Sequence, residues 1–259
     1  MKQLDLPDRI IRKYVHFLHK SLPPNPTAVQ APYDVPAEYA HDVLTSDYSP
    51  VSLQRVADDI GYYLGIPDGI TVRVLNPDAT TTTWSCTESG QADFSQPDSP
   101  VDYSGLYQAR GPGHSEIIVV RKRLYSLQHV FAILAHEYAH HYLHRYGITL
   151  NHKMRDEYLT DIATAYLGLG YYVLRGYRPI TWGTDYWQEG NAHGYTQHST
   201  SVGYLTPDTI GLAILFSAPL RRWNPRDVVR RYPTWAYRIE AYFRLLPYRL
   251  KYHNSGARI

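Results

Sequence analysis

Cysteine is almost absent from this chain of 259 residues, which has only Cys86. A single cysteine cannot form an intramolecular disulfide, so the fold has to be stabilised by its packed core. Long apolar runs are also missing, and none approaches the roughly 20 residues that a membrane-spanning helix needs. The N-terminus lacks the basic region and apolar core of a secretory signal. We therefore expect a cytoplasmic globular protein without a membrane partner.

Charge of one sign is lacking as well, because 26 Lys and Arg residues nearly balance 24 Asp and Glu residues. A formal net charge of +2 does not favour a polyanion as the partner of the whole chain. The surplus of cations lies at the C-terminal end, where residues 220–259 contain ten Lys or Arg against two acids. These arginines alternate with Tyr, Trp, Leu and Ile at helical spacing. This pattern favours a solvated helix face over a nucleic-acid-binding surface.

The most informative motif is His136-Glu137-Tyr138-Ala139-His140, within a stretch from Ser126 to Gly147 that has helical periodicity. Residues four apart lie on one face of a helix, so both histidines can bind one metal ion. The carboxyl group of Glu137 projects beside that ion and can accept a proton from a bound water. With 13 His and 7 Glu in the chain, roughly 0.02 such matches are expected by chance. The motif therefore predicts a metal site.

A catalytic zinc site takes three protein ligands and leaves a fourth position for water. The best third ligand is Glu157, which lies 17 residues after His140 in the sequence Arg-Asp-Glu-Tyr-Leu-Thr-Asp. A turn followed by an antiparallel helix would place Glu157 against the motif helix. Asp161 is one helical turn further on and can accept the ring N–H of a ligating histidine. We expect one zinc ion per chain, bound by His136, His140 and Glu157.

The periodicity of apolar residues predicts an α+β fold in which a small sheet leads into the motif helix. Predicted helices cover 6–22, 36–44, 50–64, 126–147, 154–169, 206–216, 224–232 and a segment ending near 246, and predicted strands cover 70–75, 103–108 and 116–121. Segments 76–100 and 182–203 are rich in turn-forming or polar residues and predict loops. Residues 171–175 are ambiguous between strand and helix. We expect an N-terminal helical arm with a Pro-rich linker over 1–48, a core over 49–174 and a mostly helical C-terminal extension over 175–259.

The ligand set predicts hydrolysis of a peptide bond. Zinc lowers the pKa of its bound water, Glu137 accepts the proton, and the same carboxyl group can return it to the leaving amine. The developing oxyanion needs a further donor. Side chains that could supply it follow in the Gly-rich segment after position 189, and they are His193, Tyr195, His198 and Tyr204. We take His198 and Tyr204 as the catalytic candidates, and the choice among the four stays open.

Two alternatives compete with this interpretation. His141 points about 100° away from His140 on a helix and is more typical of a surface or supporting residue. A His140/His144 ligand pair is conceivable, but it would leave Glu137 without its role. In the alternative from another functional class, the chain is a non-proteolytic regulatory or interaction protein in which the zinc is structural or the former active site senses a ligand. An intact Glu137 argues against this, because a structural site closes its fourth position and needs no base.

The order of elements from Ser49 to Leu169 resembles the ImmA/IrrE family of bacterial and phage metallopeptidases. The likeness is carried by the strands over 70–74 and 116–120, by Leu134-Ala-His-Glu-Tyr-Ala-His-His-Tyr-Leu-His144, and by Glu157 in the second helix. Where that family has Ala-Asn after its glutamate ligand, this chain has Thr160-Asp161, which is closer to the wider gluzincins. The resemblance implies a zincin-like core and a zinc endopeptidase that acts on a protein or peptide substrate, for example a regulatory protein. Nothing resembling a DNA-binding or sensor domain follows in the chain.

Overall fold

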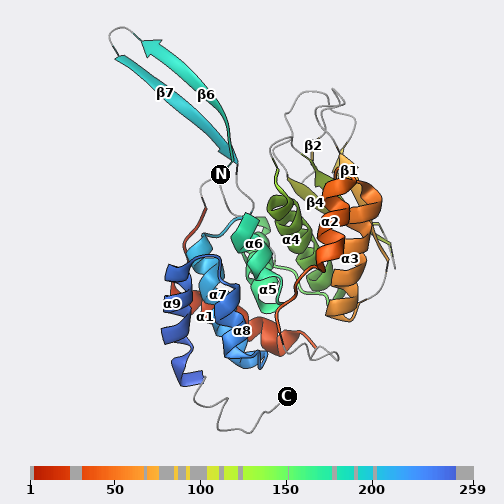
Figure 1. Cartoon of the computed structure of the whole chain (residues 1–259), viewed down its shortest axis with the longest axis vertical. Helices are drawn as coiled ribbons and strands as arrows, with labels where there is room; N and C mark the ends of the chain where they lie inside the picture. The colour runs from red at the N-terminus through yellow and green to blue at the C-terminus, as the bar shows by residue number, and fades with distance from the viewer. Residues whose placement is uncertain are drawn as a thin grey trace.

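A computed structural model describes residues 3–23, 31–66, 69–75, 85–86, 92–93, 104–110, 114–121, 125–150, 152–176, 180–189, 192–200 and 203–248. Within these residues the fold is α+β, helices dominate, and the largest sheet has three strands (Figure 1). In chain order the elements are α1 Asp8–Ser21, α2 Ala37–Thr45, α3 Pro50–Leu64, β1 Ile70–Leu75, β2 Ser85–Cys86, β3 Ala92–Asp93, β4 Gly105–Ala109, β5 Ser115–Val120, α4 Leu127–Arg145, α5 Lys153–Tyr166, α6 Gly170–Gly176, β6 Ile180–Glu189, β7 Ala192–Thr200, α7 Pro207–Leu220, α8 Pro225–Arg231 and α9 Trp235–Arg244. No helix in these ranges is both long and apolar enough to span a membrane.

The three-stranded sheet has the order β1-β5-β4. The central strand β5 runs parallel to β1 and antiparallel to β4. Ser104 accepts a backbone hydrogen bond from Val120, and Arg110 donates one to His114. Even-numbered residues of β4 therefore face β5, since pairing alternates along an antiparallel ladder. The odd-numbered backbone groups, from Gly105 to Ala109, lie on the free edge of the sheet.

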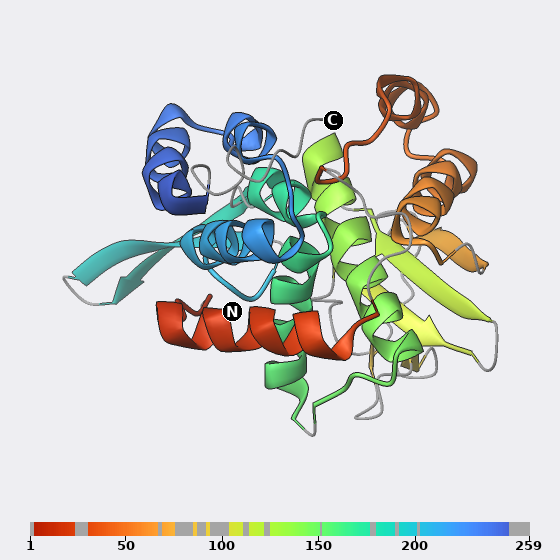
Figure 2. The same ribbon diagram turned by 90° about the horizontal axis from the view of Figure 1, so that it is seen from below.

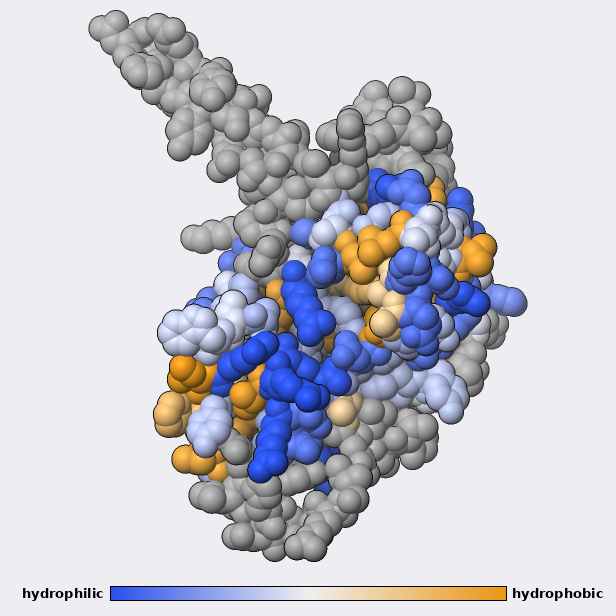
Figure 3. All heavy atoms as spheres, in the orientation of Figure 1, coloured by the Kyte–Doolittle hydropathy of each residue, from blue (hydrophilic) through white to orange (hydrophobic). Residues whose placement is uncertain are grey.

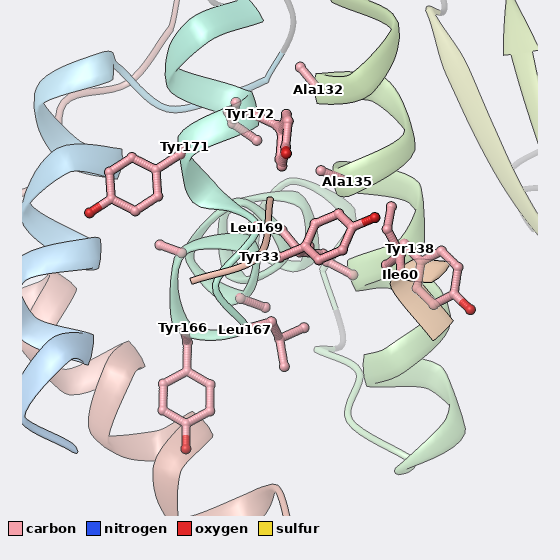
Figure 4. Packing of buried hydrophobic residues seen from close by; sticks show 14 of the residues in the cluster. Tyr33, Ile60, Ala132, Ala135, Tyr138, Tyr166, Leu167, Leu169, Tyr171 and Tyr172 are labelled. Carbon is pink, nitrogen blue, oxygen red and sulfur yellow. The ribbon is translucent and has the colours of Figure 1, made fainter. Parts of the chain in front are cut away.

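Helix α4 occupies the middle of the molecule and is buried along almost its whole length. One side packs against β4 and β5, and the other packs against α5 and α6. Figure 4 shows Ala132 and Ala135 on the side of α4 that faces α6. Small side chains there let the two helices approach closely, and a Cβ at Gly176 would overlap Ala132. This close packing fixes the position of α4 relative to the second half of the chain.

The N-terminal and C-terminal helices meet on the far side of α5. Helix α1 lies across α5 and α7, as seen from below in Figure 2. Buried tyrosines fill much of this region, and two of them bond to backbone carbonyls. Tyr171 donates to Val228 over 2.7 Å, and Tyr232 donates to Gly211 over 2.7 Å. Part of the tyrosine-rich composition is thus explained by core packing in which the hydroxyl of a buried ring has a partner.

Most predicted elements are confirmed to within a few residues. Helices α3, α7 and α8 begin after the caps Ser49, Thr206 and Asn224, each of which accepts a backbone N–H. The ambiguous segment 171–175 is helical and belongs to α6. The loop predicted over 182–203 is wrong, because β6 and β7 pair there as an antiparallel hairpin that projects from the helices (Figure 1). The segment 76–100 contains the short pair β2 and β3, and its other residues lie outside the described ranges.

Candidate metal centre

Helices α4 and α5 hold the candidate ligands, and local sequence sets the bounds of both helices. Ser126 is the N-cap of α4, and its backbone N–H donates to His129 Nδ1 over 3.3 Å. The chain leaves α4 through Gly147, which has φ +64°, a left-handed conformation that glycine adopts without steric cost. Helix α5 then begins at Lys153 and packs back against α4. This short return brings residues 136–140 opposite residues 157–161.

Three ligand atoms converge between these helices. His136 Nε2 and His140 Nε2 are 3.2 Å apart, and Glu157 Oε2 lies 3.2 Å from the first and 3.1 Å from the second. A tetrahedral ion with ligand bonds of about 2.1 Å would separate neighbouring ligand atoms by about 3.4 Å. The observed spacing is close to that value. The group His136, His140 and Glu157 can therefore hold a metal ion, as the sequence motif predicted.

The orientation of His136 is fixed from behind by Asp161. Its Nδ1 lies 2.8 Å from Asp161 Oδ1, so the ring donates its N–H there and directs Nε2 at the metal position. Asp161 is fully buried. Its second oxygen accepts the backbone N–H groups of Tyr204 and Leu205 over 2.6 and 2.9 Å. The predicted contact between Asp161 and a ligand histidine is present, with two backbone donors in addition.

His140 is oriented by Thr160, a residue that the sequence analysis did not single out. Thr160 Oγ1 donates its only hydrogen to the carbonyl of Asp156 over 2.9 Å. The hydroxyl can then only accept from His140 Nδ1, which lies 3.2 Å away. Each histidine thus has a separate acceptor behind it, and both Nε2 atoms are free to bind a metal. Thr160 and Asp161 are adjacent in the sequence, and they are the two residues that make these contacts.

Protonation of the metal-free site follows from the same contacts. Burial lowers the pKa of His136, but hydrogen bonds to Asp161 and Glu157 raise it by a larger amount. The resulting pKa is well above the ordinary value of a histidine. Burial raises the pKa of Glu157, but hydrogen bonds with His136 and His140 outweigh it and lower the net pKa. A proton on His136 Nε2 therefore lies where a metal would bind. Metal binding has to displace that proton.

Glu137 lies beside the three ligand atoms without belonging to the group that they form. It is buried, and burial raises its pKa, while the nearby His136 and His140 lower it by less. The backbone N–H of Tyr107, on the free edge of β4, bonds to its carboxylate. A Cβ at Gly105 would overlap Ile133 and the Glu137 carboxylate, so only glycine leaves room for this contact. The edge strand therefore holds the predicted base in place.

The other histidines of α4 have different surroundings. His141 is buried between the rings of Tyr107 and Tyr138, which excludes the surface position and leaves the supporting position of the two that the sequence offered. Burial, with a smaller effect of His144, lowers the pKa of His141 to about 4, and the ring stays neutral at pH 7. His144 is exposed and its Nδ1 lies 3.3 Å from the Tyr107 hydroxyl. Neither belongs to the ligand group, so the His140/His144 pair is not the one that converges.

The predicted oxyanion donors fall into two sets. The ring of Tyr204 lies 5.8 Å from that of His136, centroid to centroid, so this residue borders the metal centre. His193, Tyr195 and His198 belong to β7, whose side chains lie outside the described part of the chain, as does the side chain of Cys86 in β2. The roles predicted for His198 and Tyr204 stay predictions.

Sequence reasoning missed Thr160 and three backbone donors, those of Tyr107, Tyr204 and Leu205. A signal for Thr160 exists, because it lies three residues after Glu157 and so shares a helix face with the ligand. Backbone donors leave no trace in residue type. Comparison of the chain with models of known protein families, with curated proteins and with solved structures finds no match. The chemical assignment of the centre therefore depends on its geometry alone.

Proposed function

We propose that the protein is a zinc-dependent metallopeptidase with a zincin-like core that hydrolyses a peptide bond in a protein or peptide substrate. The observation that carries the proposal is the convergence of two Nε2 atoms and one carboxylate oxygen at 3.1–3.2 Å, beside the buried Glu137. Two imidazoles and one carboxylate form a ligand set of catalytic zinc sites. Zinc held there supplies a Lewis acid and a water whose pKa is lowered to about 7.

The chain's own residues have separable roles in this proposal. His136, His140 and Glu157 hold the ion, while Asp161 and Thr160 orient the two imidazoles. Glu137 accepts a proton from the attacking water and returns it to the leaving amine. Its pKa, raised by burial, lies closer to that of the water, which favours proton transfer in both directions.

A substrate site adjoins these residues. A cavity of about 470 Å³ lies next to His140 and Thr160 and extends along β4; its lining also includes Tyr107, Gln108, Ala109, Leu143, His144, Ile148, Thr149 and Asp156. An extended peptide could pair with the free edge of β4 and place one side chain in the cavity. The mixed polar and apolar lining fits a peptide better than a purely apolar ligand.

The competing hypothesis of a structural zinc in an interaction protein has less support. Structural zinc sites have four protein ligands. The group found among the described residues has three. A buried glutamate beside the ion has no function in a structural site, since burying a carboxylate is costly. The proposal therefore keeps the enzyme as the main hypothesis and the interaction protein as the alternative.

Metal analysis tests the proposal directly. Protein purified without chelators is expected to contain one zinc ion per chain by inductively coupled plasma mass spectrometry. Added Zn²⁺ at 100 times its dissociation constant should stabilise the folded protein by about 2.7 kcal/mol in a thermal unfolding assay. His140→Ala is expected to abolish both effects. His144→Ala is the matched control, because it removes an exposed histidine of the same helix.

Retention of stoichiometric zinc by the His140→Ala variant would show that the ligand set is wrong. A wild-type protein that takes up no divalent ion under these conditions would end the metallopeptidase proposal. Mass spectrometry of co-expressed host or mobile-element proteins then identifies substrates. Cleavage that depends on zinc distinguishes an enzyme from a binding protein.

The contact between Thr160 and His140 predicts a separate effect on metal affinity. Thr160→Val removes the hydroxyl at nearly constant volume and leaves His140 Nδ1 without its acceptor. Loss of such a supporting contact lowers metal affinity by about 10-fold to 100-fold. Competition with a fluorescent zinc chelator measures the change. Thr160→Ser keeps the hydroxyl and should restore affinity; equal affinities for the Val and Ser variants would contradict the role of Thr160.

A further inference from the structure

Helix α9 exposes an apolar stripe on its outer side. The stripe consists of Trp235, Ile239, Tyr242 and Phe243 on the helix and Leu246 just after its end, with exposed fractions from 39% to 75%. At 100° per residue the four helical positions fall within an arc about 100° wide. The opposite side of the helix packs on the protein through Ala241 and Leu245, which are buried. The apolar residues of α9 therefore exceed what the fold itself can bury.

No stripe residue lines either of the two cavities next to α9. One of these cavities is lined by Glu240, Ala241 and Arg244 of the helix, and the other by Leu245 and Tyr248 after its end. The stripe is therefore the outer, convex side of a helix. Figure 3 shows hydrophobic residues at the outer edge of the molecule, over α9, next to a strongly hydrophilic area over α8. A partner that covers a convex helix has to be deformable or concave. A lipid surface accommodates such a helix in the plane of its headgroups.

Cations border the stripe on the side of α8. Arg238 lies next to the stripe, and its Nε donates to the carbonyl of Tyr232, at the end of α8. Arg226 and Arg230 of α8 are exposed, and Arg230 pairs with Asp227 at 3.5 Å. On the other side, the carboxylate of Glu240 is paired with Arg244 at 2.9 Å. Among the described residues, the α8 side of the stripe therefore carries more cations than acids.

We propose that α9 is a peripheral membrane-binding helix that inserts its apolar stripe into the interface of an anionic bilayer, while the adjacent arginines contact lipid phosphates. Aromatic residues with aliphatic neighbours on one face and arginines beside them are typical of interfacial helices. The same positive charge disfavours a second copy of the chain, because like charges would meet. The aliphatic Ile239 and Leu246 fit acyl chains better than nucleic-acid bases, which stack on aromatic rings.

The inference goes beyond the proposed peptidase function and does not depend on the metal centre. It also revises two predictions, that the basic C-terminal segment is only a solvated helix face and that the chain has no membrane partner. The sequence showed the alternation of arginines with apolar residues but not which of those residues would be buried. In the structure the core takes Ala241 and Leu245 and leaves the larger side chains outside. A substrate that is itself at the membrane would then be brought close to the enzyme.

Vesicle flotation tests the proposal with the full-length protein. We expect binding to vesicles of 70% phosphatidylcholine and 30% phosphatidylserine, weaker binding to pure phosphatidylcholine, and weaker binding in high salt. The double variant Trp235→Ser/Phe243→Ser should lose at least about 10-fold in partition coefficient, because binding scales with inserted apolar area. The matched control is Val51→Ser/Tyr62→Ser on α3, where both residues are 75% exposed. It should bind like the wild type.

Three outcomes would overturn the inference. The first is the absence of binding to anionic vesicles, or an equal loss in both double variants. The second is sedimentation velocity showing a wild-type dimer that Trp235→Ser/Phe243→Ser converts to a monomer, which would assign the stripe to a second copy. The third is binding of a single-stranded 20-nucleotide DNA that the same variant abolishes. Circular dichroism of each variant confirms that the exposed substitutions leave the fold intact.

Discussion

Glu137→Gln is expected to lower the rate of peptide hydrolysis by about 10²-fold to 10⁴-fold, the usual contribution of a general base. Glutamine has nearly the same shape as glutamate, and its carbonyl can still accept the backbone N–H of Tyr107 that bonds the carboxylate. It cannot accept the proton of the attacking water. Metal content should stay at one ion per chain, because Glu137 is not part of the ligand group. Mass spectrometry of a digested peptide library measures the rate.

The matched control is Glu38→Gln, the same chemical change at an exposed position of α2. This variant should hydrolyse the library at the wild-type rate. A Glu137→Gln variant with undiminished activity would exclude the proposed base while leaving the metal site intact. Loss of zinc from that variant would instead show that Glu137 supports the ligands.

Asp161→Ala is expected to lower the free energy of unfolding by about 3–5 kcal/mol, as for a buried charged group whose partners are left behind. The substitution removes the acceptor of His136 and of two backbone N–H groups, those of Tyr204 and Leu205. This loss includes the cost of each buried donor left without a partner, which is about 1–3 kcal/mol. Urea unfolding monitored by circular dichroism, with and without zinc, measures the loss.

Asp161→Asn separates stability from metal binding. Its amide oxygen can accept both backbone N–H groups, but its NH₂ group would face the N–H of His136, donor against donor. Stability should therefore fall much less than in the alanine variant, while zinc affinity falls by about 10-fold to 100-fold. If the two variants lose equal stability, the anchoring of residues 204 and 205 is not the role of this carboxylate.

The sequence predicted the helices and ligands of the metal centre because they depend on local rules. Residues 136 and 140 share a helix face by spacing alone, and Ser126 and Gly147 mark the ends of that helix. The short connection between α4 and α5 makes the two helices antiparallel neighbours, and this places Glu157 opposite the two histidines. The same spacing rule predicts the contact of Thr160, because this residue lies on the same face of α5 as Glu157.

Other features depend on tertiary structure. Tyr204 and Leu205 act through backbone N–H groups, which every residue except proline possesses, so their place beside Asp161 has no signature in sequence. The hairpin of β6 and β7 was mistaken for a loop because its composition is rich in Gly, His and Asn. The pair Gly190-Asn191 between runs of Thr, Tyr and Trp is a hairpin signal that outweighs composition.

The backbone bonds to Asp161 also have a consequence for shortened chains. Asp161 orients His136 and is itself held by the backbone N–H groups of Tyr204 and Leu205, with Leu4 paired to Leu205 beside them. A chain cut before residue 204 would keep both metal-binding helices but would leave Asp161 without these two donors. Its His136 imidazole would then be held less firmly, because the carboxylate behind it would have lost its own anchors.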